Sequence, residues 1–266
     1  MKKKVRIIVA AHKEFQMPED KIYLPVHVGA AGKESIGYQR DDEGDNISDL
    51  NPLYCELTGL YWAWKNLDAD YKGLVHYRRY FKGKGKGNSP FDKVLSGKEL
   101  RFLLRKYKII VPRKRRYYIE TLYSHYEHTH YEEEMIETRK IISEIYPEYL
   151  SSYDKTMNRT WGYMFNMMIM SSELLDEYCT WLFNILDELV LRVDVESRSD
   201  FEKRYPGRIS EMIFNTWLDY KISKNEISQD DIAELPFIYM EKINYFDKGM
   251  SFLKAKFFNK KQEKSF

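Results

Sequence analysis

The sequence predicts an α/β fold in which a mostly parallel sheet is flanked by helices, with extra helices in the carboxyl half. Three observations support this prediction. Apolar runs rich in β-branched residues, such as residues 5–11, are typical of strands buried on both faces of a sheet. Segments with apolar residues at helical spacing lie between these runs. Strand and helix therefore alternate, and this alternation favours a parallel sheet.

The amino-terminal third contains the clearest predicted elements. Residues 5–11 form the first strand and residues 23–28 a short second strand. The segment 29–48 is rich in Gly, Asp and Asn, which predicts a long irregular loop, and loops of this length are often functional. Pro52 opens an amphipathic helix, and strand 71–77 follows that helix directly.

The rest of the chain continues the alternation. A KGKGKGNSP linker leads to a helix at about 97–106 and a strand at 108–111, which Pro112 ends. The polar segment 119–153 is expected to be helical. The remaining predicted elements are strand 161–170, helices 172–192 and 210–222, and strand 237–240.

Composition and length narrow the class of protein. The 266 residues, 43% of them apolar, can bury the core of one large domain. The 43 basic and 41 acidic side chains leave a net charge of +2, so overall charge indicates no partner. The apolar run 5–11 is too short for an export signal, and the longest uncharged stretch, 160–172, is too short to cross a bilayer. Cys55 and Cys179 lack metal-ligand spacing and are expected to be reduced thiols in the cytosol.

The most specific pattern is a pair of aromatic and basic motifs. ELTGLYWAWKN occupies residues 56–66 and GLVHYRRYF residues 73–81, accompanied by VAAHK, GDNIS, FNMMIM and GRISEM. With these motifs, the chain from about Val5 to Tyr220 resembles the DUF4422 family of bacterial capsular and exopolysaccharide glycosyltransferases. The resemblance implies a GT-A-like, Rossmann-like scaffold. It also implies a hexosyltransferase that moves a sugar from a nucleotide sugar, with UDP-galactofuranose or another UDP-hexose as candidates, to a growing surface polysaccharide.

The same resemblance suggests how the chain is divided. Residues 1–247 would form one GT-A-like domain, with a donor half at about 1–112 and an acceptor half at about 113–247. Residues 248–266 form a basic, aromatic tail, which suits either an anionic membrane surface or a disordered soluble segment. The enzyme is therefore expected in the cytoplasm, either free or peripheral on the inner face of the plasma membrane.

Candidate catalytic residues follow from where ligands bind in open α/β sheets, beyond the carboxyl ends of the strands. His76, Arg78 and Arg79 lie at the carboxyl end of a predicted strand and could supply donors or cations to a departing pyrophosphate. For the two arginines, exposed salt bridging is the ordinary alternative. Glu211 follows Ser210, a predicted N-cap. It could accept the proton of an acceptor hydroxyl, or simply stabilise the helix terminus.

The predicted donor site draws on three segments. Small residues at the end of the first strand would let a base or ribose approach the backbone, and the next two residues could reach base or phosphate. The Asp-Asn-Ser cluster of the long loop could contact donor, or only form turns. A buried Asn in an apolar run needs hydrogen-bond partners and could bind sugar hydroxyls. The candidates are Ala10, Ala11, His12, Lys13, Asp45, Asn46, Ser48 and Asn166.

Metal dependence is left open by the sequence. Most GT-A enzymes hold a divalent cation, Mn or Mg, through a D-x-D motif just after the strand, and no acidic pair occurs there. Asp68 and Asp70 form a literal D-x-D, but they precede the strand and are expected to form a turn. His125, His128 and His130 lack the spacing of a zinc site. No metal ligand is therefore predicted.

Other features suggest partners or rival functions. RKRR at 113–116 could bind phosphates of the donor or of a lipid-linked or oligosaccharide acceptor, or be merely solvated, and Glu56 is a weak site candidate. RKRR, the tail and the aromatic surplus also fit a nucleic-acid-binding protein. The near-neutral charge and the lack of a recognised module argue against nucleic acid as a partner. A catalytically silent scaffold in a polysaccharide assembly complex is the third alternative.

Overall fold

The sheet that organises the molecule confirms the predicted fold class. A computed structural model describes residues 3–241. Its main sheet runs β10-β6-β9-β4-β1-β2-β3, and every strand on this path is parallel to the others except β9. The strands are β1 (Val5–Ala11), β2 (Tyr23–His27), β3 (Gln39–Arg40), β4 (Tyr71–His76), β5 (Arg79–Phe81), β6 (Ile109–Pro112), β7 (Arg115–Arg116), β8 (Trp161–Gly162), β9 (Met168–Ser171), β10 (Ile232–Leu235) and β11 (Phe237–Tyr239).

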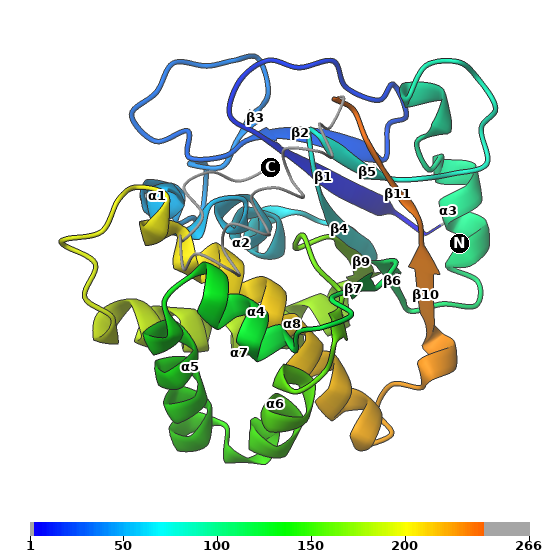
Figure 1. The fold of residues 1–266 in the computed structure, drawn as a ribbon. Coiled ribbons are helices and arrows are strands. Elements are labelled where there is room, and N and C mark those ends of the chain that lie inside the picture. The colour runs from blue at the N-terminus through cyan, green and yellow to red at the C-terminus, as the bar shows by residue number, and fades with distance from the viewer. Residues whose placement is uncertain (1–2, 242–266) are drawn as a thin grey trace.

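Helices cover both faces of the sheet, and the alternation of side chains along β1 explains how. Ile8 and Ala10 point into the larger core, which most of the helices share, whereas Ile7 and Val9 point into a smaller core with α3. Figure 1 shows α3 apart from the group formed by α7 and α8. The helices are α1 (Asn51–Tyr54), α2 (Leu57–Asn66), α3 (Gly97–Leu103), α4 (Leu122–Thr129), α5 (Glu132–Ile145), α6 (Leu150–Met157), α7 (Ser172–Arg192) and α8 (Tyr205–Ser223).

Two predicted elements are interrupted. The helix that opens at Pro52 is broken between α1 and α2, because Cys55 has a φ of 52°, outside the helical region. The single strand predicted at 161–170 is instead β8 and β9, separated by a turn. In that turn Phe165 and Asn166 have φ values of 77° and 50°. The second interruption places the polar side chain of Asn166, which is 3% exposed, within an otherwise apolar segment.

The start of α8 is also corrected. The helix begins at Tyr205, with Pro206 in its first turn, so Ser210 is not an N-cap. Ser210 is fully buried inside the helix, and Glu211 lies beyond the first turn. The prediction that Glu211 lies in the first helical turn is therefore wrong.

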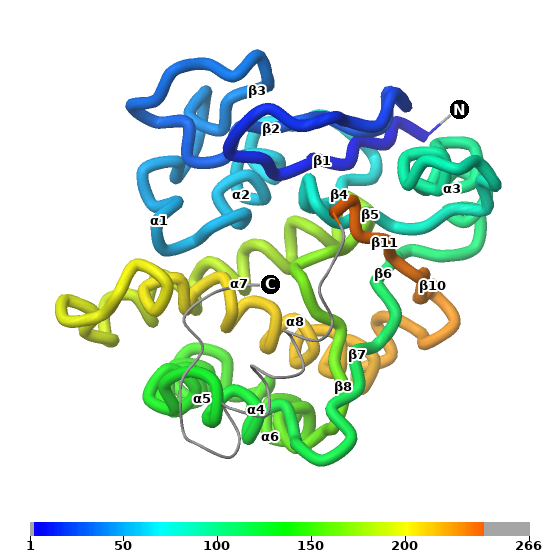
Figure 2. Tube along the Cα trace, turned by 45° about the horizontal axis from the view of Figure 1, so that its top comes forward, coloured from blue at the N-terminus to red at the C-terminus, as the bar shows by residue number. Residues whose placement is uncertain are grey.

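The boundary predicted at residue 247 and the tail 248–266 lie outside the described residues. Among residues 3–241, no helix is long and apolar enough to span a membrane. Figure 2 shows the sheet strands above the group of helices α4, α5 and α6. The carboxyl-terminal strand β11 pairs with β5, beside the end of β4.

Candidate active site

The carboxyl ends of β1, β2 and β4 form one edge of the sheet. Ala10 is aligned with His76 of β4, and Ala11 with His27 of β2. The backbone continues this alignment beyond the strands, because the N–H of Tyr77 donates to the Ala10 carbonyl over 3.1 Å. The predicted donor residues at 10–13 and the predicted catalytic residues at 76–79 therefore lie side by side.

A group of basic side chains gathers around His12. Partial burial lowers the pKa of His12, and neighbouring positive charges lower it further. These charges belong, in order of effect, to Lys13, Arg78, Arg204 and Lys33. The ring of His12 lies edge-on to Tyr77, which itself stacks on Phe15 with a centroid separation of 3.6 Å. The edge thus combines positive charge with aromatic faces, a surface suited to an anion attached to a ring.

His76 contributes a neutral imidazole to this edge. Burial, and then the charges of Arg78 and Arg79, lower the pKa of His76 to about 3. Its Nδ1 accepts a hydrogen bond from the backbone N–H of Arg78 over 3.3 Å. At neutral pH His76 can therefore offer a donor at Nε2, but no positive charge.

Two carboxylates are held by the turn between β8 and β9. The backbone N–H of Phe165 donates to the carboxylate of Glu211. The side-chain amide of Asn166 donates to Glu56 Oε1 over 2.9 Å and to the carbonyl of Gly207 over 3.0 Å. In return, the Ser210 hydroxyl donates to Asn166 Oδ1 over 2.7 Å. The two left-handed residues of this turn thus fix both carboxylates, and such backbone strain is concentrated at functional sites.

Glu211 has the properties of a proton acceptor. Burial raises the pKa of Glu211 to about 7, the neighbouring Glu56 carboxylate raises it too, and the Phe165 N–H, Arg79 and Arg115 counteract the rise. A carboxyl group with a pKa near 7 can exchange a proton at the working pH of a cell. Glu211 does not stabilise a helix terminus, because α8 begins at Tyr205. Its buried position and raised pKa are consistent with the alternative, a catalytic role.

Arg79 connects the carboxylates to the sheet edge. Its guanidinium lies 4.0 Å from the centroid of the Phe165 ring and 4.9 Å from that of Tyr239. Its Nε is buried and has no hydrogen-bond partner among the described residues. Arg204 makes a second connection, because its charge affects both His12 and Cys55, the residue before Glu56. The basic group and the carboxylate pair therefore belong to one region.

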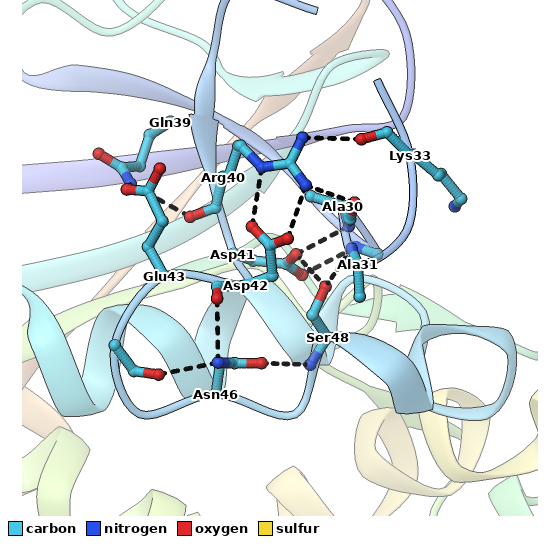
Figure 3. A network of polar contacts seen from close by, with 12 residues as sticks. Ala30, Ala31, Lys33, Gln39, Arg40, Asp41, Asp42, Glu43, Asn46 and Ser48 are labelled. Atoms are coloured by element: carbon cyan, nitrogen blue, oxygen red, sulfur yellow. Dashed lines mark hydrogen bonds and ion pairs between the residues drawn. The ribbon is translucent and has the colours of Figure 1, made fainter. Parts of the chain in front are cut away.

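The long loop is organised around a buried carboxylate that the sequence did not single out. Asp41 accepts hydrogen bonds from the N–H groups of Gly29 and Ala30 over 2.8 and 3.0 Å, and from the hydroxyls of Ser48 and Thr58 over 2.5 and 2.6 Å. Figure 3 shows this network beside the ion pair of Arg40 with Asp42. The network fixes the segment that contains Lys33 against β2 and α2.

The candidates of this loop make contacts that hold the loop itself. Ser48 is buried, with its hydroxyl on Asp41. Asn46 donates to the carbonyls of Asp42 and Gly44 over 3.2 and 2.8 Å (Figure 3). Asp45 accepts from the Tyr61 hydroxyl over 3.2 Å. Their predicted contact with a donor stays a prediction.

The literal D-x-D lies at the opposite end of the strands. Asp68 pairs with Lys4 over 2.5 Å, and Asp70 accepts the N–H of Lys4 over 2.6 Å, both next to the first residues of β1 and β4. His125 and His128 both contact the buried Glu120, over 2.8 and 3.0 Å. Within residues 3–241, no group of three His, Cys, Asp or Glu side chains is placed to hold a metal ion.

Two basic residues of the site were missed from the sequence. Lys33 lies in the long loop and Arg204 just before α8, and neither stands in a motif. The only available signal for Arg204 is Pro206, which marks a helix start and would have placed Arg204 at a helix terminus. Their approach to His12 depends on the tertiary fold.

The fold defines a mixed α/β protein, with basic, aromatic and acidic side chains gathered near the carboxyl ends of β1, β2 and β4. Residues 6–224 match the family model described as a domain of unknown function, DUF4422, and the chain belongs to that family. A solved structure, the WbbM bifunctional glycosyltransferase in its apo form, is similar with a TM-score of 0.81 and 29% identity. The match covers 90% of this chain and 46% of WbbM, so the chain spans about half of that protein. No curated protein matches.

Proposed function

We propose that the protein is a glycosyltransferase that uses a nucleotide sugar as donor. The observation on which this rests is the pair of carboxylates, Glu56 and Glu211, held beside Arg79 and a group of basic side chains at the sheet edge. The similarity to the WbbM bifunctional glycosyltransferase supports the proposal. Further proposals are that the donor is UDP-galactofuranose or another UDP-hexose, and the acceptor a growing surface polysaccharide.

The basic group suits the donor's diphosphate. In transfer, the bond between the anomeric carbon and the diphosphate oxygen breaks, and negative charge develops on the leaving group. Arg78, Arg79, Lys13 and Arg204 would stabilise that charge, since preorganised cations lower the barrier for such steps. The aromatic faces of Tyr77 and Phe15 lie next to these cations and could stack on the base.

The carboxylate pair suits the acceptor. The acceptor hydroxyl oxygen forms the new bond to the anomeric carbon, and its proton passes to Glu211, whose pKa near 7 allows it to act as general base. Glu56 remains hydrogen-bonded to Asn166 and would orient the acceptor or the sugar. One bond forms, one bond breaks and the proton is accepted by Glu211, so the transfer needs no oxidant or reductant. A divalent cation would be an additional aid to the leaving group.

Thermal unfolding separates this proposal from its rivals. A UDP-hexose at about ten times its Kd should stabilise the protein by about 1.4 kcal/mol, a shift of roughly 3 °C, with or without manganese. Single-stranded RNA should neither shift the melting temperature nor compete. A shift with RNA alone would favour a nucleic-acid-binding protein. Binding of a UDP-hexose without turnover on any glycan acceptor would favour a silent scaffold.

Chelation tests the role of metal directly. Because Asp68 and Asp70 lie at the far end of the strands, we expect turnover to survive EDTA. Complete inhibition by EDTA, reversed by manganese, would show that a metal takes part and is held by residues other than Asp68 and Asp70.

A further inference from the structure

The turn between β7 and α4 presents two apolar side chains to solvent. Tyr118 and Ile119 are 85% and 68% exposed, and they are adjacent in sequence. Tyr118 has a φ of 43°, in the left-handed region that a bulky residue rarely adopts. Figure 2 shows the segment that follows β7 at the edge of the molecule. Neither the strained backbone nor the exposed apolar side chains stabilise the fold, and such strain is concentrated at functional sites.

The base of this turn is firmly held, so the exposure is not a frayed end. The N–H of Tyr117, a buried residue, donates to the carbonyl of Thr160 over 2.8 Å, and its carbonyl accepts the N–H of Glu120 over 3.1 Å. Glu120 is itself 4% exposed and contacts His125 and His128. The apolar pair therefore stands on a rigid support.

Basic side chains flank the apolar pair. Arg113 and Arg116 are exposed, and no described residue forms an ion pair with either of them. The other two basic residues of RKRR have partners within the protein. Lys114 forms an ion pair with Glu234 over 2.8 Å, and Arg115 lies over the Tyr117 ring at 4.9 Å. The turn thus carries positive charge next to an exposed Tyr and Ile. This combination suits the boundary between anionic headgroups and acyl chains.

We propose that the segment Arg113 to Ile119 is a docking surface for an anionic membrane. Tyr118 and Ile119 would enter the headgroup region, while Arg113 and Arg116 would contact lipid phosphates. Charge complementarity selects this partner over a neutral one. Two residues of the same segment interact electrostatically with Glu211: Arg115 lowers the pKa of Glu211, and Glu211 raises the pKa of Tyr117. Docking here would therefore bring the region of Glu211 close to the lipid surface, and the docking itself does not depend on transferase activity.

The chain offers a matched control on another element. Phe102 of α3 is 69% exposed and is also flanked by basic residues, Arg101 and Arg105. Cosedimentation of the full chain would be measured with phosphatidylcholine vesicles, with and without about one third phosphatidylglycerol. We expect Y118S/I119S to weaken binding to the anionic vesicles about tenfold or more, and F102S to leave it unchanged. Arg113→Ala and Arg116→Ala should each weaken it about fivefold at low salt.

A fluorescent label reports insertion without relying on affinity. An environment-sensitive dye on I119C should brighten when anionic vesicles are added, and the same dye on F102C should not. The native thiols interfere little, since Cys179 is buried and burial raises the pKa of the Cys55 thiol to about 12. Unchanged vesicle binding by a folded Y118S/I119S variant, or brightening at residue 102 alone, would overturn the proposal.

Discussion

The side-chain amide of Asn166 donates a hydrogen bond to Glu56 over 2.9 Å, although the two residues are 110 positions apart. The backbone conformation of Asn166, with a φ of 50°, makes this contact possible. Glycine adopts the same conformation without a penalty. We therefore expect Asn166→Gly to keep the fold but to lower kcat/KM by about 10- to 100-fold, through loss of a hydrogen bond to a charged group.

The matched measurement is Asn166→Ala, which loses the amide and is also strained in the left-handed region. Its kcat/KM should fall as much as that of the glycine variant, and its free energy of unfolding should be lower. If Asn166 acts by positioning Glu56, the pH profile of activity should change in both variants. Full activity in Asn166→Gly would show that the contact has no functional role.

Glu211 should set the pH dependence of transfer. Burial raises its pKa to about 7, and only the deprotonated form can accept the proton of a hydroxyl. We expect kcat/KM to rise with pH and to level off above about 7, with Glu211→Gln lowering it by at least 100-fold at every pH. Steady-state kinetics between pH 5 and 9 measure this. A variant of the exposed Glu173 on α7, Glu173→Gln, should follow the wild-type profile.

Arg79 should act in the transition state. Its guanidinium is held over Phe165 and Tyr239, and its Nε lacks a partner among the described residues. Arg79→Ala should lower kcat/KM by the equivalent of about 2 to 4 kcal/mol, and Arg79→Lys should recover little, because the planar guanidinium is needed. The same loss is expected for Arg78→Ala. Wild-type turnover in both alanine variants at an unchanged melting temperature would exclude the pair from the mechanism.

Asp41 and Asp42 should differ in their effect on stability. Asp41 is fully buried and accepts four hydrogen bonds, whereas Asp42 forms a partly exposed ion pair with Arg40. Denaturant unfolding should show Asp41→Asn to be destabilised by about 2 to 4 kcal/mol, because an amide cannot accept from all four donors. Asp42→Asn should cost less than about 1 kcal/mol. Equal costs would mean that the network in Figure 3 does not hold the loop.

How far the sequence predicts the molecule depends on whether a signal is local. The strand 5–11 was predicted with its true bounds, because a β-branched apolar run needs no distant partner to be recognised. The turn at Phe165 was missed, since two non-glycine residues with positive φ leave no local mark and the segment reads as one strand. The partnership of Glu56 with Asn166, and the approach of Lys33 and Arg204 to His12, arise only when remote segments meet.

His76 should make the protein sensitive to acid. Burial, and then Arg78 and Arg79, lower its pKa to about 3 in the folded state, against about 6.5 in an unfolded chain. The unfolded state therefore binds more protons between these values, so the free energy of unfolding must fall as pH decreases from 6.5 toward 3. At pH 5 the loss from this group is about 2 kcal/mol relative to pH 8.

Urea unfolding at both pH values should show that His76→Gln loses less stability on acidification than the wild type. An acid sensitivity equal to that of the wild type in His76→Gln would mean that His76 is not held neutral by its surroundings.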